Sequence, residues 1–157
     1  MTIRFAETRD IPQLLALLKQ VNNVHHEIRP DLFVAEQAKY DAAALETMLA
    51  DPAVKIFVAA DAQGLVQGYM LAYLRPRRGV NLTGGVSFYI DDLCVDEACR
   101  GQGVGRALFD RAKTYAAEAG CRELLLNVWE GNDAALRFYS HCGLRPRSRL
   151  LELETGI

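Results

Sequence analysis

The sequence has no long apolar run, no excess of charge of either sign and no clustered cysteines. None of its hydrophobic stretches approaches the length that a helix needs to span a bilayer, and its first residues have no apolar core of signal-peptide length. The 157 residues carry a formal net charge of −2, which argues against nucleic acid or an anionic membrane as the main partner. We therefore expect a cytoplasmic protein without a nucleic-acid or membrane partner.

Side chains that hold metals are also scarce. The four cysteines form no C-x-x-C pair, and the three histidines stand in no spacing that is typical of a zinc site. Reduced thiols that pack in the interior are the better interpretation, and we expect no metal site. The cysteines are Cys94, Cys99, Cys121 and Cys142.

What is present is the composition of an ordinary globular domain, with 50% hydrophobic and 24% charged residues. No repeat, low-complexity tract or linker divides the chain, so residues 1–157 are expected to form a single domain. Its hydrophobic periodicity predicts strands at residues 2–6, 54–60, 65–74, 86–95, 123–129 and 148–154, and helices at 11–21, 35–50, 103–119 and 132–143. Residues 22–34 and 75–85 are expected to be irregular. This order favours an α/β (α+β) fold with a mixed, largely antiparallel sheet and helices on both faces.

The most informative segment is Arg100-Gly101-Gln102-Gly103-Val104-Gly105, which follows one of the predicted strands and opens a predicted helix. Glycine allows a tight turn and the close approach of a ligand, and the first amides of a helix attract anions because they lack internal partners. Arg100 and Arg106 add positive charge at both ends. The spacing fits neither the dinucleotide fingerprint nor the nucleoside-triphosphate loop. On spacing alone, a phosphate site and an ordinary strand-to-helix turn are equally open.

Two further segments strengthen a resemblance to the GNAT superfamily of acyl-CoA-dependent N-acyltransferases. Residues 100–105 fit its R/Q-x-x-G-x-G/A pyrophosphate signature, and Tyr89-Ile90-Asp91-Asp92-Leu93-Cys94-Val95 looks like the preceding strand. Asn132-Asp133-Ala134-Ala135-Leu136-Arg137-Phe138-Tyr139 looks like the family's N-x-x-A-x-x-F-Y segment, with Leu144 replacing the usual aromatic that follows it. The resemblance implies the GNAT fold, with a central sheet of six to seven strands.

The resemblance also implies acetyl-CoA as the cosubstrate, whose acetyl group passes directly to a primary amine in a ternary complex. Amides at residues 102–106 would hold the pyrophosphate, and the backbone at residues 93–95 would pair with the pantetheine arm like an added strand. A backbone N–H near Leu93 would stabilise the oxyanion intermediate. The implied cofactor-binding residues are Leu93, Cys94, Val95, Arg100, Gly101, Gln102, Gly103, Val104, Gly105, Arg106, Asn132 and Tyr139.

Tyr139 and Asp91 are the candidate catalytic residues. The resemblance implies that the Tyr139 hydroxyl faces the thioester sulfur and protonates the departing thiolate. Because a tyrosine pKa of about 10 exceeds a thiol pKa of about 8.5, a hydrogen bond to the developing charge is a safer description than full transfer. The alternative is that Phe138 and Tyr139 only pack the helix.

A carboxylate would assist the acceptor amine, and the strand offers Asp91 and Asp92. Side chains alternate along a strand, so one of them at most should face the acceptor unless a bulge re-aims them, and Asp91 is preferred. Because an ordinary Asp pKa is about 3.9, the carboxylate is a poor direct base for an ammonium group, and it would act through a water molecule or as an electrostatic anchor. The alternative is a carboxylate that caps amides at a strand end.

The loop after the first helix would line the acceptor site, and it carries His25, His26, Glu27, Asp31 and Glu36. The acidic residues favour a cationic amine, although an ordinary solvated loop is an equal interpretation. The preferred acceptor is a small molecule such as a polyamine, amino acid or amino metabolite. A peptide or protein amine is the alternative, and a non-catalytic acyl-CoA-binding module is the alternative of another class. A homodimer is a possibility that rests solely on the frequency of dimers in the family.

Overall fold

A five-stranded sheet forms the centre of the computed structural model, which describes residues 1–156. The strands lie in the order β1-β2-β3-β4-β5, and neighbours are antiparallel except for β4 and β5, which are parallel. This arrangement confirms the mixed, largely antiparallel sheet expected from the sequence. The strands are β1 (Thr2–Phe5), β2 (Val54–Ala60), β3 (Val66–Pro76), β4 (Val86–Val95) and β5 (Glu123–Leu126).

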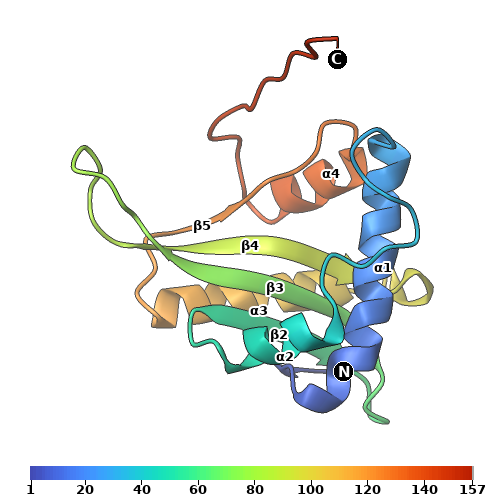
Figure 1. The fold of residues 1–157 in the computed structure, drawn as a ribbon. Helices are drawn as coiled ribbons and strands as arrows, with labels where there is room; N and C mark the ends of the chain where they lie inside the picture. Colours follow the sequence, from blue (N-terminus) through green and yellow to red (C-terminus); the bar gives the residue numbers. More distant parts are fainter. Residues whose placement is uncertain (157) are drawn as a thin grey trace.

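Helices cover both faces of the sheet. Helices α1 (Ile11–Ile28) and α2 (Ala42–Ala50) pack on one apolar cluster, and they lie in front of the sheet in Figure 1. Helices α3 (Val104–Glu118) and α4 (Asp133–His141) pack on a second cluster, with α3 behind the sheet. Side chains of β2 alternate between the clusters, as a strand period of two requires: Ile56 and Val58 face α1, whereas Phe57 and Ala59 face α3. Within residues 1–156, no helix is long and apolar enough to cross a membrane.

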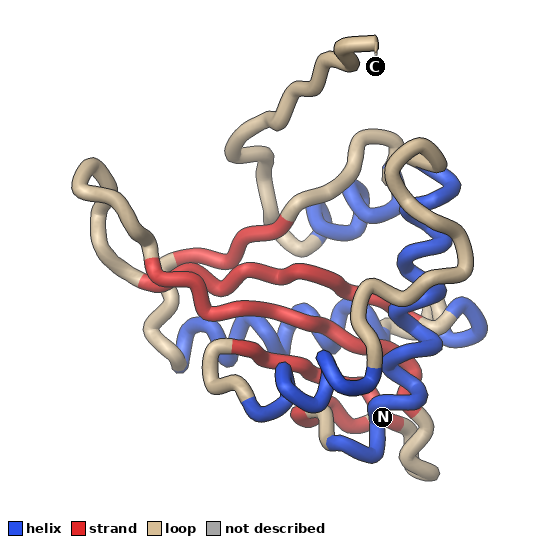
Figure 2. Tube along the Cα trace, in the orientation of Figure 1, coloured by secondary structure: helices blue, strands red, loops and turns tan. Residues whose placement is uncertain are grey.

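The prediction of a strand at residues 148–154 is wrong, and the sheet has five strands rather than six or seven. After α4, the described residues form no strand, and residues 145–156, which we call the tail, extend away from the domain (Figure 2). An alternating sequence becomes a strand only where a neighbour completes its backbone hydrogen bonds. A single copy offers the tail no such neighbour. Strand β5 also ends at Leu126 and not at residue 129, because the part of β4 beside it has by then diverged.

Both N-terminal helices have boundaries that differ from those predicted. Helix α1 continues through residues expected to be irregular, because the side chains of Asn22 and Asn23 point outward and bind the following loop. It ends before Pro30, whose ring disfavours a helical conformation in the preceding residue. Helix α2 begins at Ala42 and not at residue 35, since the Asp41 carboxylate accepts the first free amide. Residues 29–41 therefore form a connection, which we call the α1–α2 loop.

Candidate functional site

A β-bulge in β4 places two carboxylates on the same side of the sheet. Leu71 of β3 pairs with Asp92, but the next residue, Ala72, pairs with Ile90, so Asp91 is an additional residue in the register. The Asp91 carboxylate bonds with the α1–α2 loop, and the same loop's lysine charge acts on Asp92. Strict alternation would have separated the two side chains, so the exception that a bulge allows applies here.

Asp91 already holds an ammonium group in this structure. The Nζ atom of Lys39, from the α1–α2 loop, lies 2.6 Å from Asp91 Oδ2. The Tyr40 hydroxyl donates to the same oxygen at 3.2 Å and lies 3.0 Å from the hydroxyl of Tyr73. Burial alone would lower the pKa of Lys39, but the hydrogen bond from its ammonium to Asp91 and the charges of both carboxylates raise it. These groups therefore stabilise the protonated form of the Lys39 side chain.

Asp92 is the more unusual of the two carboxylates. It is buried, and its Oδ2 atom has no hydrogen-bond partner among residues 1–156. Burial raises its pKa to about 7; the Lys39 charge opposes this rise and the Asp91 charge adds to it. The hydroxyl of Tyr69, on β3, is likewise buried without a partner in the described chain. Asp92 can therefore gain or lose a proton near neutral pH.

Tyr139 lies on α4 with its ring packed against other aromatic rings. Its centroid is 6.4 Å from that of Phe109 and 5.1 Å from that of Phe138. Burial raises the pKa of the Tyr139 hydroxyl, and the charge of Asp92 raises it further. The hydroxyl therefore stays protonated and lies within electrostatic reach of Asp92. Packing holds only the ring, so it is compatible with a reacting hydroxyl.

The glycine turn exposes backbone amides at the start of α3. Gly101 and Gly103 have φ angles of 74° and 81°, in the left-handed region that favours glycine, and no side chain caps the helix. A Cβ atom at either position would meet nothing within 4 Å, so the turn is open to a ligand. Arg106 forms an ion pair with Asp110 at 2.9 Å, so its charge is shared within the helix. The first amides of α3 therefore have no side-chain partner.

A slot opens between β4 and β5 where the two strands diverge. Strand β5 pairs with β4 only from Ser87 to Ile90, whereas Leu93 and Val95 pair with β3 on their other side. The backbone of residues 93–95 therefore lacks a strand neighbour toward β5. A thin ligand with amide groups fits such a gap as an additional strand.

Two of the expected cofactor-binding residues are partly occupied by other contacts. The Cys94 thiol points toward α1, where Gln20 donates to its Sγ atom at 3.3 Å and burial raises its pKa to about 12. Only the Cys94 backbone can contribute to the slot. The Asn132 side-chain oxygen accepts the Ala135 amide at 3.2 Å as the cap of α4, which leaves its NH2 group for a ligand.

Two of the acidic residues expected to line the acceptor site form ion pairs within the chain. Asp31 pairs with Arg29 at 2.6 Å, and Glu36 pairs with Lys19 at 2.5 Å, both on the outside of the loop. Negative charge comes instead from the two aspartates of the bulge. Burial and the charge of Lys39 lower the pKa of His25.

Sequence reasoning missed Lys39, Tyr40 and Tyr73 as parts of the site. Tyr73 shares a strand face with Leu71 and Tyr69, so pairing of β3 with β4 would have pointed to it. Nothing in the sequence placed the α1–α2 loop over Asp91. No group of three or more His, Cys, Asp or Glu side chains able to hold a metal occurs in the described part of the chain.

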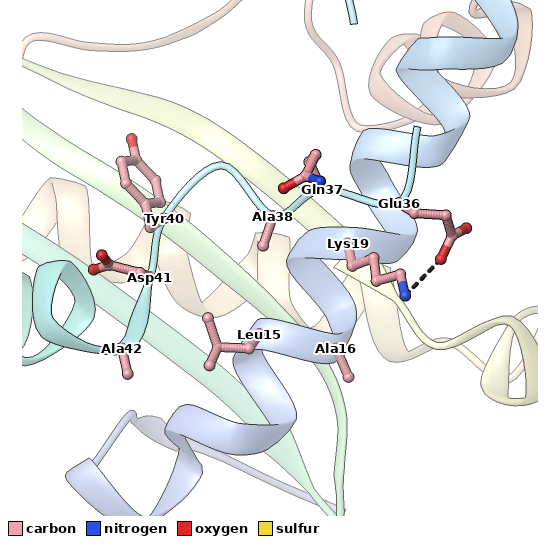
Figure 3. A pocket seen from close by; sticks show the side chains of 9 residues that line it. All are labelled: Leu15, Ala16, Lys19, Glu36, Gln37, Ala38, Tyr40, Asp41 and Ala42. Carbon is pink, nitrogen blue, oxygen red and sulfur yellow. Dashed lines mark ion pairs between the residues drawn. The ribbon is translucent and has the colours of Figure 1, made fainter. Parts of the chain in front are cut away.

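A hollow of about 480 Å³ lies outside this site, between α1 and the end of the α1–α2 loop. Figure 3 shows the ion pair of Lys19 and Glu36 at one side of it and the Tyr40 ring at the other. Neither carboxylate of the bulge nor Tyr139 lines it. The hollow is therefore separate from the two carboxylates and from Tyr139.

Comparisons with known proteins agree with this geometry. Residues 21–144 match the acetyltransferase (GNAT) family. The chain is 28% identical to a putative phosphinothricin acetyltransferase, YwnH, of Bacillus subtilis over 91% of this chain and 83% of that one. It is 28% identical to a peptidyl-lysine N-acetyltransferase, YjaB, of Salmonella typhimurium over 95% of this chain and 86% of that one. A crystal structure of a mutant of the BH1408 protein from Bacillus halodurans superposes with a TM-score of 0.93, at 27% identity, over 98% of this chain and 99% of that one.

Proposed function

The chain belongs to the GNAT acetyltransferase family and is an acyl-CoA-dependent N-acetyltransferase, and we propose that it acetylates the primary amine of a small cationic molecule, with acetyl-CoA as the donor. The observation that carries this proposal is the bulge in β4, which sets Asp91 and Asp92 side by side. One carboxylate is arranged to hold an ammonium ion, and the other can take up a proton near neutral pH.

On the donor side, we assign the pyrophosphate of acetyl-CoA to the exposed amides of residues 102–106. We place the pantetheine arm along the backbone of residues 93–95 and assign further polar contacts to Arg100 and Asn132. This arrangement brings the thioester between β4 and α4, next to Tyr139. The support is the uncapped start of α3 together with the unpaired side of β4.

Replacement of Gly103 by Ala should weaken CoA binding about tenfold, because an Ala in the left-handed region distorts the amides that face the pyrophosphate. Gly120, at the other end of α3, provides a matched control with φ of 70° and no atom within 4 Å of a Cβ. Both variants should lose about 1 kcal/mol of stability. Calorimetric titration with CoA, alongside thermal unfolding, tests this; equal CoA affinities in the two variants would remove the phosphate role from the turn.

On the acceptor side, we assign the two aspartates different tasks. Asp91 binds the substrate ammonium in the place that Lys39 occupies, and Asp92 accepts the proton, directly or through one water. An alkylammonium with a pKa of about 10.4 is rarely the free base at neutral pH, so a proton acceptor is needed. The free amine attacks the thioester carbon, and the tetrahedral adduct then breaks its C–S bond. The Tyr139 hydroxyl stabilises the departing thiolate, which leaves as the CoA thiol after taking up the proton that the nitrogen loses as the amide forms. Asp92 then releases its proton to solvent.

Contacts between the α1–α2 loop and the segment after β5 favour a small substrate over a peptide. Phe33 of the α1–α2 loop meets Trp129, which follows β5, with ring centroids 5.3 Å apart. The Arg29 guanidinium also lies 6.0 Å from the Trp129 ring centroid. These contacts join the α1–α2 loop to the segment after β5, whereas an extended peptide needs an open groove. A peptide amine remains the second candidate because one relative is a peptidyl-lysine N-acetyltransferase.

Replacement of Lys39 by Met should lower KM for a cationic amine about fivefold, because the variant removes an internal competitor for Asp91. It should also move the pH dependence of the rate upward, since the Lys39 charge lowers the pKa of Asp92. Lys19→Met is the matched control, because Lys19 pairs with the same loop at Glu36. Steady-state kinetics at several pH values would contradict the assignment if KM rose in the Lys39 variant.

The proposed function is tested by measuring release of the CoA thiol from acetyl-CoA in the presence of candidate amines. The panel contains polyamines, amino acids, aminoglycosides and short lysine peptides. We expect stimulation by small cationic amines and little by peptides. Stimulation by peptides alone would reverse the choice of acceptor, and stimulation by none, with CoA binding intact, would contradict the assigned acceptor class.

A further inference from the structure

Lys39 places a primary amine of the chain itself where we assign the acceptor amine. Its Nζ atom lies 2.6 Å from Asp91 Oδ2, and its charge acts on Asp92 as well. The same atom lies 5.4 Å from the centroid of the Tyr40 ring, so the ammonium also has a cation–π contact. One chain therefore brings together an amine, a carboxylate that holds it and a second carboxylate that can take up its proton.

Asp92 connects Lys39 with the donor side of the site. The charge of Lys39 acts on Asp92, and the charge of Asp92 acts on the hydroxyl of Tyr139, which we assign to the departing thiolate. Both aspartates belong to the bulge of β4, and residues 93–95, which we assign to the pantetheine arm, follow them directly. Lysine carries its amine on a flexible four-carbon stem, which allows Nζ to adjust its position relative to a bound thioester.

We propose that the enzyme acetylates its own Lys39 from acetyl-CoA when no other amine occupies the acceptor site. The inference rests on the proposed function, because it uses the same donor and the same aspartates. Asp92 takes one proton from the Lys39 ammonium, the free Nζ attacks the thioester carbon, and the adduct breaks its C–S bond. The thiolate takes up the proton that the nitrogen loses as the amide forms and leaves as the CoA thiol. Asp92 releases its proton to solvent.

The modification removes the charge that occupies Asp91. An acetylated lysine side chain is a neutral amide, so it cannot form an ion pair and leaves Asp91 free for the ammonium of a substrate. Loss of the Lys39 charge also raises the pKa of Asp92. Lys39 thus acts as a first substrate, built into the α1–α2 loop, whose acetylation gives the site the charges that it has in Lys39→Met.

Lys19 shows how far exposure alone would lead to acetylation. The side chains of Lys19 and Lys39 are 47% and 48% exposed, and each pairs with a carboxylate, that of Lys19 being Glu36 at the hollow in Figure 3. A spontaneous reaction depends on exposure and on the free-base fraction of the amine. Burial alone would lower the pKa of Lys39, but the two aspartates raise it, which reduces its free-base fraction. Preferential acetylation of Lys39 therefore requires the enzyme's site.

Incubation of the full chain with an excess of acetyl-CoA, in a buffer without amines, tests the proposal. We expect intact mass spectrometry to show a gain of one acetyl group per chain. Peptide mapping should place it at Lys39 rather than at Lys19, Lys55 or Lys113, the other lysines of the sequence. The initial rate at Lys39 should exceed that at Lys19 by about 10²-fold. Equal rates at the two lysines would overturn the proposal.

Matched variants identify the acceptor and the catalyst. Lys39→Arg keeps a positive charge beside Asp91 but offers no amine, so it should gain no acetyl group, whereas Lys19→Arg should gain one as before. Tyr139→Phe should slow acetylation of Lys39 about 10²-fold with an unaltered circular dichroism spectrum. Chains already acetylated at Lys39 when purified support the proposal if Tyr139→Phe chains are not. An unchanged rate in Tyr139→Phe would overturn it.

Two comparisons complete the test. The rate constant should not depend on the protein concentration, because the transfer takes place within one chain; a rate constant that rises with concentration would overturn the proposal. Acetylation of added amines without modification of Lys39 would overturn self-acetylation and leave the proposed function standing. Modification of Lys39 without acetylation of any added amine would support self-acetylation and contradict the assigned acceptor class. Neither reaction, with CoA binding intact, would overturn both.

Discussion

Replacement of Tyr139 by Phe should lower kcat by about 10²-fold while leaving the affinity for CoA unchanged. The change removes one hydroxyl from a ring that Phe109 and Phe138 hold in place, so the fold and the slot remain. The lost hydroxyl is the donor that we assign to the departing thiolate. Single-turnover rates and CoA titrations separate the two quantities.

Tyr115→Phe is the matched control for this change, because Tyr115 packs among Phe5, Phe57 and Phe88 away from the bulge. It loses the same atom and should keep its rate. Because burial raises the pKa of Tyr139, its hydroxyl stays protonated across the working range. The variant should therefore keep the pH profile of the unaltered enzyme at a lower level. A full rate in Tyr139→Phe would leave only the packing role.

Replacement of Asp92 by Asn should abolish most activity and at the same time stabilise the fold. We expect a loss of at least about 10²-fold in kcat at neutral pH, because Asn cannot take up the proton. In the unaltered enzyme, the rate should rise with pH as Asp92 ionises and level off above a pH of about 7. The variant should lack that rise.

The stability change follows from the direction in which the pKa of Asp92 moves. Burial raises it from 3.8 to about 7, so between these values the unfolded chain ionises Asp92 and the folded chain does not. Unfolding is therefore favoured increasingly as the pH rises through this window, by on the order of 4 kcal/mol in total. Asn avoids this loss. Denaturant unfolding should show a variant that is more stable at high pH, with the difference shrinking toward acid.

Asp91→Asn separates the two carboxylates. It should raise KM for the amine, because the ammonium loses its ion pair, and it should affect kcat less than Asp92→Asn does. Removal of the Asp91 charge also lowers the pKa of Asp92, so the rise of the rate should begin at lower pH. If Asp91→Asn abolished kcat and Asp92→Asn did not, the two assignments would have to be exchanged.

Features that depend on local sequence were predictable, and those that depend on a partner segment were not. The three-glycine turn, the Asn132 cap and the apolar strand at residues 54–60 are marked by neighbours along the chain, and the structure has them. The bulge at Asp91 is defined by the pairing of β4 with β3. The sequence of β4 alone therefore allowed a bulge as an alternative but could not show that one forms at Asp91. The contact of Lys39 with Asp91 spans two distant segments, and no local signal marks it.

The bulge also acts as a phase shift within a single strand. Upstream of Asp91, Phe88 and Ile90 point toward α3; downstream, Leu93 does so only because one extra residue has been inserted between them. Loss of a single residue here would force one half of β4 to turn its side chains over, so that either the core or the slot would be inverted. An insertion or deletion at this point should therefore be tolerated only where two residues are gained or lost together, because two residues restore the alternation. A single substitution that keeps the backbone does not change the alternation.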